Sequence, residues 1–120
     1  MAYTFINRTI ETSILKASRL FPAIVVTGPR QSGKTTLLRH LFPSSTYISL
    51  DDPLIRQQAI DDPAMLFGSN QGASYIIDEI QYVPELTTYI KTLIDRDRQT
   101  PGRFFITGSQ RFPLMKHLGD

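Results

Sequence analysis

Residues 28–36, with the sequence GPRQSGKTT, combine two glycines, a lysine and two threonines at a spacing that can hold phosphate groups. Gly28 and Gly33 can adopt backbone angles closed to other residues, so the amides between them can turn inward as a concave anion nest. A helix beginning at Lys34 would add its unpaired N–H groups and the positive end of its dipole. The Lys34 ammonium suits the β- and γ-phosphates of a nucleotide, and the Thr35 hydroxyl suits Mg²⁺.

The pattern predicts nucleotide contacts along the whole segment, at Gly28, Pro29, Arg30, Gln31, Ser32, Gly33, Lys34, Thr35 and Thr36. Within it, Arg30 and Gln31 could equally face solvent, and Arg30 is assigned no catalytic role. The alternative for the segment is a glycine-rich turn whose lysine lies in solvent. The buried strand expected before the segment and the helix expected after it favour the phosphate site.

A second group of candidate residues follows the apolar run SYIID, residues 74–78. Asp78 should emerge at the carboxyl end of a buried strand, where ligands bind in open α/β sheets. There it can hold Mg²⁺, through water, opposite Thr35. Glu79 can polarise an attacking water as a general base, which suits ATP hydrolysis. The alternative is that both acids cap the following turn.

The run RFFITG, residues 103–108, is followed by Ser109 and Gln110. If this strand lies between the phosphate-loop strand and the Asp78 strand, its polar end reaches the γ-phosphate or the attacking water. Ser109 is favoured for that sensing role, with Thr107 and Gln110 as rivals. A strand-to-helix turn capped by Ser109 explains the spacing equally well. The predicted catalytic residues are therefore Lys34, Glu79 and Ser109, and the predicted metal ligands are Thr35 and Asp78.

Other nucleotide-dependent classes fit the sequence less well. The guanine-reading Asn-Lys-x-Asp segment of Ras-type GTPases is missing. A small-molecule kinase would need an arginine-bearing lid, and the nearest candidates are Arg96, Arg98 and Arg103. The first two share a predicted helix end with Asp95 and Asp97, which indicates a solvated terminus whose charges pair with one another.

The composition describes a folded protein of one ordinary domain, with 120 residues, 41% hydrophobic and 20% charged residues, and a net charge of +2. A pI near 9.1 is weak support for nucleic-acid binding, and no base-reading motif supports a DNA partner. The chain has no cysteine, and His40 and His117 lack a metal-ligand spacing. No apolar run is long enough for a membrane span and no signal peptide is recognisable, so a cytoplasmic protein is expected.

Predicted strands alternate with predicted helices from residue 23 onward, which favours a parallel α/β sheet with right-handed crossovers. The predicted strands are 23–27, 47–50, 74–78 and 103–108, and the predicted helices are 10–20, 34–42, one from 53, one from 63, one from 84 and 112–118. Residues 1–22 are expected to be a helical lead-in, and 23–120 an α/β domain built around the phosphate-binding segment. The Asp-Asp-Pro repeats at 51–53 and 61–63 indicate two helix starts, with a metal-binding carboxylate cluster as the alternative. Gly68 should end the second of these helices.

Several blocks of the sequence, in order, resemble the prokaryotic AAA-14 ATPases, which are AAA+-like P-loop proteins usually followed by a DUF4143 region. The blocks are TGPRQSGKTTLLRHLF, YISLDDP, YIIDEIQYVPEL, IKTLIDRDR and RFFITGSQRFPLMKHL. The resemblance implies a P-loop NTPase sheet with strand order 1-4-3-2. It also implies ATP and Mg²⁺ as ligands, with roles for Lys34, Thr35, Asp78 and Glu79. The C-terminal region of the family is similar to restriction-endonuclease-like folds, so a defence or DNA-linked role is compatible with the resemblance.

The sequence departs from the family pattern at its end. In family members, the segment that matches residues 112–118 continues into a Ser-Leu-x-Gly-Arg stretch, a further strand and the C-terminal region. The chain is therefore expected to be the N-terminal portion of a longer protein and to lack the arginine that meets transition-state charge. Two functions follow: an ATPase module completed by a C-terminal domain or by a homo-oligomer, or an inactive nucleotide-holding domain that acts only through a partner.

Overall fold

The computed structural model describes residues 3–28, 33–68 and 73–109, with the side chains of the first helix described from Ile10 onward. The elements are, in order, α1 (Tyr3–Ser18), β1 (Ala23–Thr27), α2 (Lys34–Leu41), β2 (Thr46–Ser49), α3 (Pro53–Asp61), α4 (Pro63–Phe67), β3 (Tyr75–Asp78), the 3-10 helix η1 (Ile80–Tyr82), α5 (Glu85–Arg96) and β4 (Phe104–Gly108). Each predicted strand is present within one residue at either end, whereas α1 begins well before the predicted start at Ile10. The predicted helix 112–118 and Gln110 lie outside the described residues.

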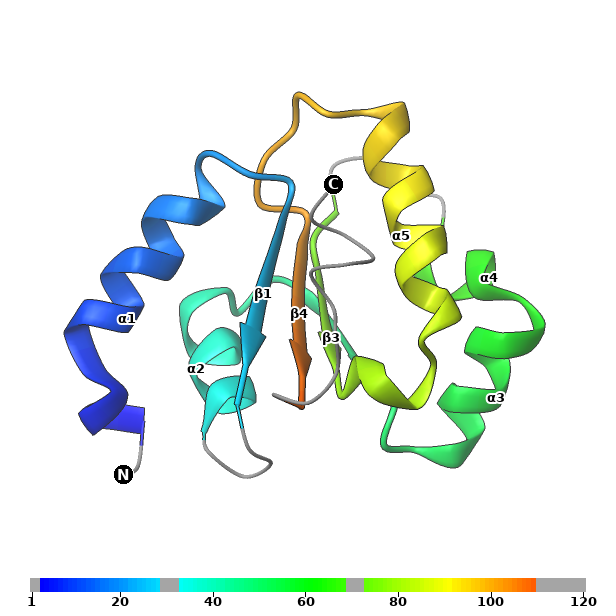
Figure 1. Ribbon diagram of the computed structural model, residues 1–120, viewed down its shortest axis with the longest axis horizontal. Helices are drawn as coiled ribbons and strands as arrows, with labels where there is room; N and C mark the ends of the chain where they lie inside the picture. Colours follow the sequence, from blue (N-terminus) through cyan, green and yellow to red (C-terminus); the bar gives the residue numbers. More distant parts are fainter. Residues whose placement is uncertain (1–2, 29–32, 69–72, 110–120) are drawn as a thin grey trace.

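The four strands form one parallel sheet with the order β1-β4-β3-β2, which confirms the predicted P-loop NTPase arrangement (Figure 1). β4 is therefore inserted between β1 and β3, so the strand that precedes the phosphate loop does not pair with the strand that ends in Asp78. Because all strands are parallel, their carboxyl ends lie at one edge of the sheet. Thr27 is opposite Gly108 in the register, and Ser49 is opposite Asp78.

The helices cover both faces of the sheet, with α1 and α2 on one face and α3, α4 and α5 on the other (Figure 1). The strand side chains alternate between these faces, as the two-residue period of a strand requires. On the α5 face the buried core consists of Ile48, Leu50, Ala59, Phe67, Tyr75, Ile77, Ile80, Val83, Leu86, Ile90, Ile94, Phe104 and Ile106. On the α1 and α2 face it consists of Ile14, Leu37, Leu38, Ile76 and Phe105. The predicted lead-in helix thus contributes Ile14 to the core on its face.

The two Asp-Asp-Pro segments begin helices, as predicted. The Asp52 carboxylate accepts a hydrogen bond from the backbone N of Leu54 at 2.9 Å and caps α3. Asp62 occupies the corresponding position before α4 and also ends α3, but its side chain makes no capping hydrogen bond. Among the described residues no group of three or more acids or histidines could hold a metal, so the alternative of a carboxylate cluster is wrong. Gly68, with φ 59°, ends α4 as predicted.

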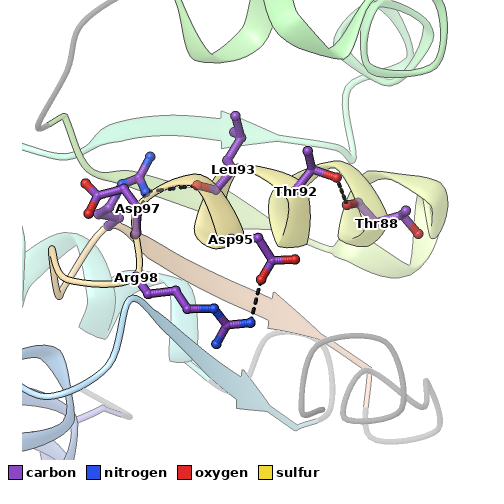
Figure 2. A network of polar contacts seen from close by, with 7 residues as sticks. Thr88, Thr92, Leu93, Asp95, Asp97 and Arg98 are labelled. Atoms are coloured by element: carbon purple, nitrogen blue, oxygen red, sulfur yellow. Dashed lines mark hydrogen bonds and ion pairs between the residues drawn. The ribbon is translucent and has the colours of Figure 1, made fainter.

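The charged end of α5 lies at the amino edge of the sheet, because α5 leads directly into the start of β4. Figure 2 shows the Arg98 guanidinium paired with Asp95 at 2.5 Å. Arg103 donates to the carbonyl oxygens of Leu93 and Asp97 at 3.3 and 3.4 Å. Arg98 and Arg103 therefore both interact with groups at the C-terminal end of α5, at the opposite edge of the sheet from Asp78. In the part of the chain that the structure describes, no helix is long and apolar enough to cross a bilayer.

Candidate nucleotide-binding site

The two described flanks of the glycine-rich segment are the end of a strand and the glycine-capped start of a helix. Gly28 follows β1, is buried, and donates its backbone N–H to the Gly108 carbonyl at 3.2 Å. Gly33 caps α2 with φ 88°, in the left-handed region that favours glycine. Lys34, the first residue of α2, is only 5% exposed. The lysine therefore does not lie in solvent, as the alternative of a plain glycine-rich turn would require.

The remaining residues of this segment are placed unequally. Thr36 is exposed on the first turn of α2. Pro29, Arg30, Gln31 and Ser32 lie outside the described residues.

The structure brings together the two predicted metal ligands. The Thr35 hydroxyl donates to Asp78 Oδ1 at 2.6 Å, although the two residues are far apart in the sequence. Thr35 comes from the first turn of α2 and Asp78 from the last position of β3, and Asp78 is 9% exposed. A hydroxyl and a carboxylate are both hard oxygen ligands, and Mg²⁺ is usually held by one or two carboxylates together with phosphate oxygens. This pair fits Mg²⁺ and offers none of the nitrogen or sulfur ligands that other metals prefer.

Two further hydroxyl groups contact the Asp78 carboxylate. Thr107, fully buried in β4, donates to Oδ1 at 2.6 Å, and Tyr47, in β2, donates to Oδ2 at 3.0 Å. Burial raises the pKa of the Tyr47 phenol above its usual value, and the negative charge of Asp78 raises it further, against the opposing effects of Ser49 and Arg39. The phenol is therefore a proton donor at neutral pH. Four elements, α2, β2, β3 and β4, thus meet at one carboxylate.

Glu79 is held in an unusual backbone conformation next to Asp78. Its φ is 60°, and among the described residues Glu79 is the only non-glycine residue with a positive φ. Such a backbone conformation costs on the order of 1–3 kcal/mol and tends to occur at functional sites. Its backbone N–H donates to the Thr107 hydroxyl at 3.0 Å, and its carboxylate accepts from Gln81 Nε2 at 2.6 Å. Glu79 is 6% exposed. The β3–η1 turn therefore points its side chain into the structure rather than into solvent.

Ser109 follows β4 at the same edge of the sheet. Ser109 contacts Gln81 through its backbone, whose N–H donates to Gln81 Oε1 at 3.2 Å. The side chain of Thr107, in β4, does reach the acidic pair. From the sequence, Thr107 was a rival of Ser109 for the sensing role. Because strand side chains alternate, the side chain of Thr107 is directed to the acidic pair only if β4 is adjacent to β3.

The sequence-based prediction missed Tyr47 and Gln81. Tyr47 lies in the run YISL and looks like an ordinary strand residue, and its hydroxyl reaches Asp78 only because β2 pairs with β3 in this register. Gln81 lies in the DEIQ block, whose polar last residue was a usable signal. The Arg39 guanidinium carbon lies 4.5 Å from the centre of the Tyr47 ring, which adds a cation–π contact on the side of α2.

Comparisons with known proteins agree with this geometry. The model of the AAA-14 family, described as an AAA domain, matches residues 20–120. Two similar curated proteins are the uncharacterized protein Mb2031c of Mycobacterium bovis and the uncharacterized protein Rv2008c of Mycobacterium tuberculosis. Each is 35% identical over 104 residues, which cover 86% of this chain and 23% of the relative. The chain thus spans about a quarter of the length of these relatives.

No solved structure matches the chain significantly. The family match covers the four-stranded sheet and every element that contributes to the site, from β1 to β4. The chain therefore belongs to the AAA-14 family, whose AAA domain is an ATPase-like nucleotide-binding domain.

Proposed function

We propose that the chain binds ATP together with Mg²⁺ at the carboxyl edge of the sheet, and that Glu79 serves as the general base for ATP hydrolysis. The observation that carries the proposal is the 2.6 Å hydrogen bond between the Thr35 hydroxyl and Asp78 Oδ1. It joins the first turn of the helix after the glycine-rich segment to an acid at the end of a buried strand. Phosphate-loop proteins hold Mg²⁺ with residues of these two types.

Gly33, Lys34 and Thr35 would each have a distinct role in binding, together with Asp78. Gly33 allows the chain to turn sharply into α2, so that the free N–H groups of the first turn can face a phosphate. Lys34 would contribute its positive charge to the β- and γ-phosphates from a position that is largely shielded from water. Because shielding lowers the effective dielectric constant, the attraction is stronger than for a lysine in solvent. Thr35 and Asp78 would hold Mg²⁺, which when bound offsets negative charge on the phosphate oxygens.

Glu79 is the described residue that best fits the role of the base. It directly follows the proposed metal ligand Asp78 in the sequence, its backbone has a positive φ, and its side chain is held by Gln81. Its Oε1 accepts a hydrogen bond from Gln81 Nε2 at 2.6 Å, which holds one oxygen of the carboxylate in place. A base in this position would accept a proton from the water as the water attacks the γ-phosphate.

The binding part is tested by titrating a fluorescent ATP analogue into the chain with Mg²⁺ and with EDTA. We expect saturable binding that is weakened at least about ten-fold by Lys34→Ala, because a shielded charge on the phosphates is removed. Lys16→Ala, which removes an exposed lysine of the last turn of α1, is the matched control and should bind as the wild type does. Equal binding by both variants would contradict the proposed site.

The hydrolysis part needs a separate measurement. Glu79→Gln keeps the size of the side chain and removes its ability to accept the proton, so phosphate release should fall by about 100-fold or more while the affinity for the analogue is retained. A variant that loses affinity and turnover together would show that Glu79 supports the structure of the site rather than the chemistry. If the wild type binds the analogue but shows no measurable turnover, the hydrolysis part is refuted and the chain is a nucleotide-holding domain.

A further inference from the structure

The side chain of Gln81 lies between Glu79 and the chain that follows β4. Its Nε2 donates to Glu79 Oε1 at 2.6 Å, and its Oε1 accepts from the backbone N of Ser109 at 3.2 Å. Gln81 is half-buried in η1, the short 3-10 helix directly after β3. One amide group therefore connects the side chain of Glu79 to the main chain after β4.

The orientation of this amide is fixed by the chemistry of its partners. An ionised carboxylate can only accept hydrogen bonds, and a backbone N–H can only donate one. The contact therefore needs a donor and an acceptor on the same side chain, and the amide of glutamine provides them on two different atoms. Asparagine is one methylene shorter, by about 1.5 Å, and would not span both partners from the same backbone position.

The contact continues the connection between β3 and β4 beyond the backbone ladder. The register of these strands ends at Ile77 and Ile106. Past that point, Thr107 holds the carboxylate of Asp78 and the backbone of Glu79, whereas Gln81 holds the carboxylate of Glu79. The carboxylate of Asp78 is thus held by Thr107 of β4, whereas the carboxylate of Glu79 is connected through Gln81 to Ser109, directly after β4.

We propose that Gln81 is a positioning residue for Glu79, and that it makes the direction of the Glu79 carboxylate depend on the position of the Ser109 main chain. The proposal rests on the proposed role of Glu79 as the base. Gln81 contacts neither Lys34, Thr35 nor Asp78 through the hydrogen bonds described above, so its loss should affect the chemical step and not the binding of nucleotide. A change in the chain after β4 would reach Glu79 through this amide.

The connection itself is tested in the nucleotide-free chain by ¹H–¹⁵N NMR of the Ser109 amide. Glu79→Ala removes the carboxylate that orients Gln81 and should shift the Ser109 amide signal. In the presence of Gln81→Ala, the same substitution should shift that signal by no more than about half as much, because the connecting side chain is gone. Equal shifts in both backgrounds would overturn the proposed connection.

The consequence for turnover is tested by steady-state kinetics on the full chain. Gln81→Ala should lower kcat by about ten-fold and leave KM and the affinity for the fluorescent analogue within about two-fold, because one hydrogen bond to a charged group is lost. Gln81→Glu keeps an acceptor for Ser109 but places a second carboxylate against Glu79, so it should lower kcat at least as much. A kcat of Gln81→Ala within about two-fold of the wild type would overturn the positioning role.

The chain offers a matched control in Gln57. Its Nε2 donates to the Asp61 carboxylate at 3.0 Å on the exposed surface of α3, so Gln57→Ala removes the same type of hydrogen bond away from the site. It should leave kcat and KM unchanged. A chain that binds no ATP analogue refutes the proposed function and its kinetic consequence, whereas the amide comparison still decides whether Gln81 connects the two segments.

Discussion

Replacing Thr107 by valine tests the idea that one buried hydroxyl joins the carboxyl ends of β3 and β4. Valine has nearly the same shape as threonine, so Thr107→Val removes the hydroxyl without leaving a large cavity. The hydroxyl donates to Asp78 Oδ1 at 2.6 Å and accepts from the backbone N–H of Glu79 at 3.0 Å, and the side chain is fully buried. The variant therefore loses both contacts at once.

The expected loss of stability follows from these two contacts. A hydrogen bond to a charged group contributes about 1.5–3 kcal/mol, and a buried N–H left without a partner costs about 1–3 kcal/mol. The low ends sum to about 2.5 kcal/mol, and the additional methyl group of valine returns about 0.8 kcal/mol through burial. The free energy of unfolding should therefore fall by about 2 kcal/mol, which corresponds to a decrease of about 1–2 M in the urea midpoint.

The assay is urea unfolding followed by far-UV circular dichroism, with EDTA present so that a bound metal does not contribute. Thr92→Val is the control, because the Thr92 hydroxyl donates to the Thr88 carbonyl at 3.1 Å on the exposed surface of α5 (Figure 2). Its free energy of unfolding should change by less than about 0.5 kcal/mol. If the two variants lose the same stability, the hydroxyl of Thr107 does not have the joining role argued here.

Three further predictions concern the frame that supports the site. Ile90→Ala, at a fully buried position of α5, should lower the free energy of unfolding by about 2–5 kcal/mol in the same urea assay; a loss under 1 kcal/mol would contradict the core packing. Gly102→Ala should cost at least about 1 kcal/mol, because φ is 67° and an added Cβ would lie 2.9 Å from the Ser18 carbonyl oxygen; unchanged stability would refute this close approach. The Thr100 hydroxyl lowers the pKa of the Asp97 carboxyl, so Thr100→Val should raise that pKa in a carboxyl NMR titration. Because the folded-state pKa is lowered, this hydrogen bond stabilises the wild type above the unfolded-state pKa, and the stabilisation is lost as the pH falls through the folded-state pKa. The variant should lack this pH-dependent contribution.

Much of the architecture could be predicted because it depends on short-range patterns. The apolar runs around Val25, Ile76 and Phe105 each have the length and composition of a buried strand, and the prolines at 53 and 63 mark helix starts. Gly33 and Gly68 are at positions where the backbone has positive φ, which glycine tolerates without steric cost. The positions of α1 and η1 were less accessible, because the first begins earlier than its apolar pattern and the second is too short to have one.

The sequence by itself determined the chemistry of the candidate site: the glycine-rich segment, Lys34, Thr35 and the acids Asp78 and Glu79 are recognised by residue type and by spacing along the chain. Only the tertiary structure decided which other groups contact those acids. Tyr47 and Thr107 reach Asp78 because β2 and β4 both pair with β3 in one particular register. Gln81 contacts Glu79 within the same turn, but its contact with Ser109 also needs β4 next to β3. Contacts between strands depend on which strands are neighbours and on register, and a shift of one residue would turn each of these strand side chains to the other face.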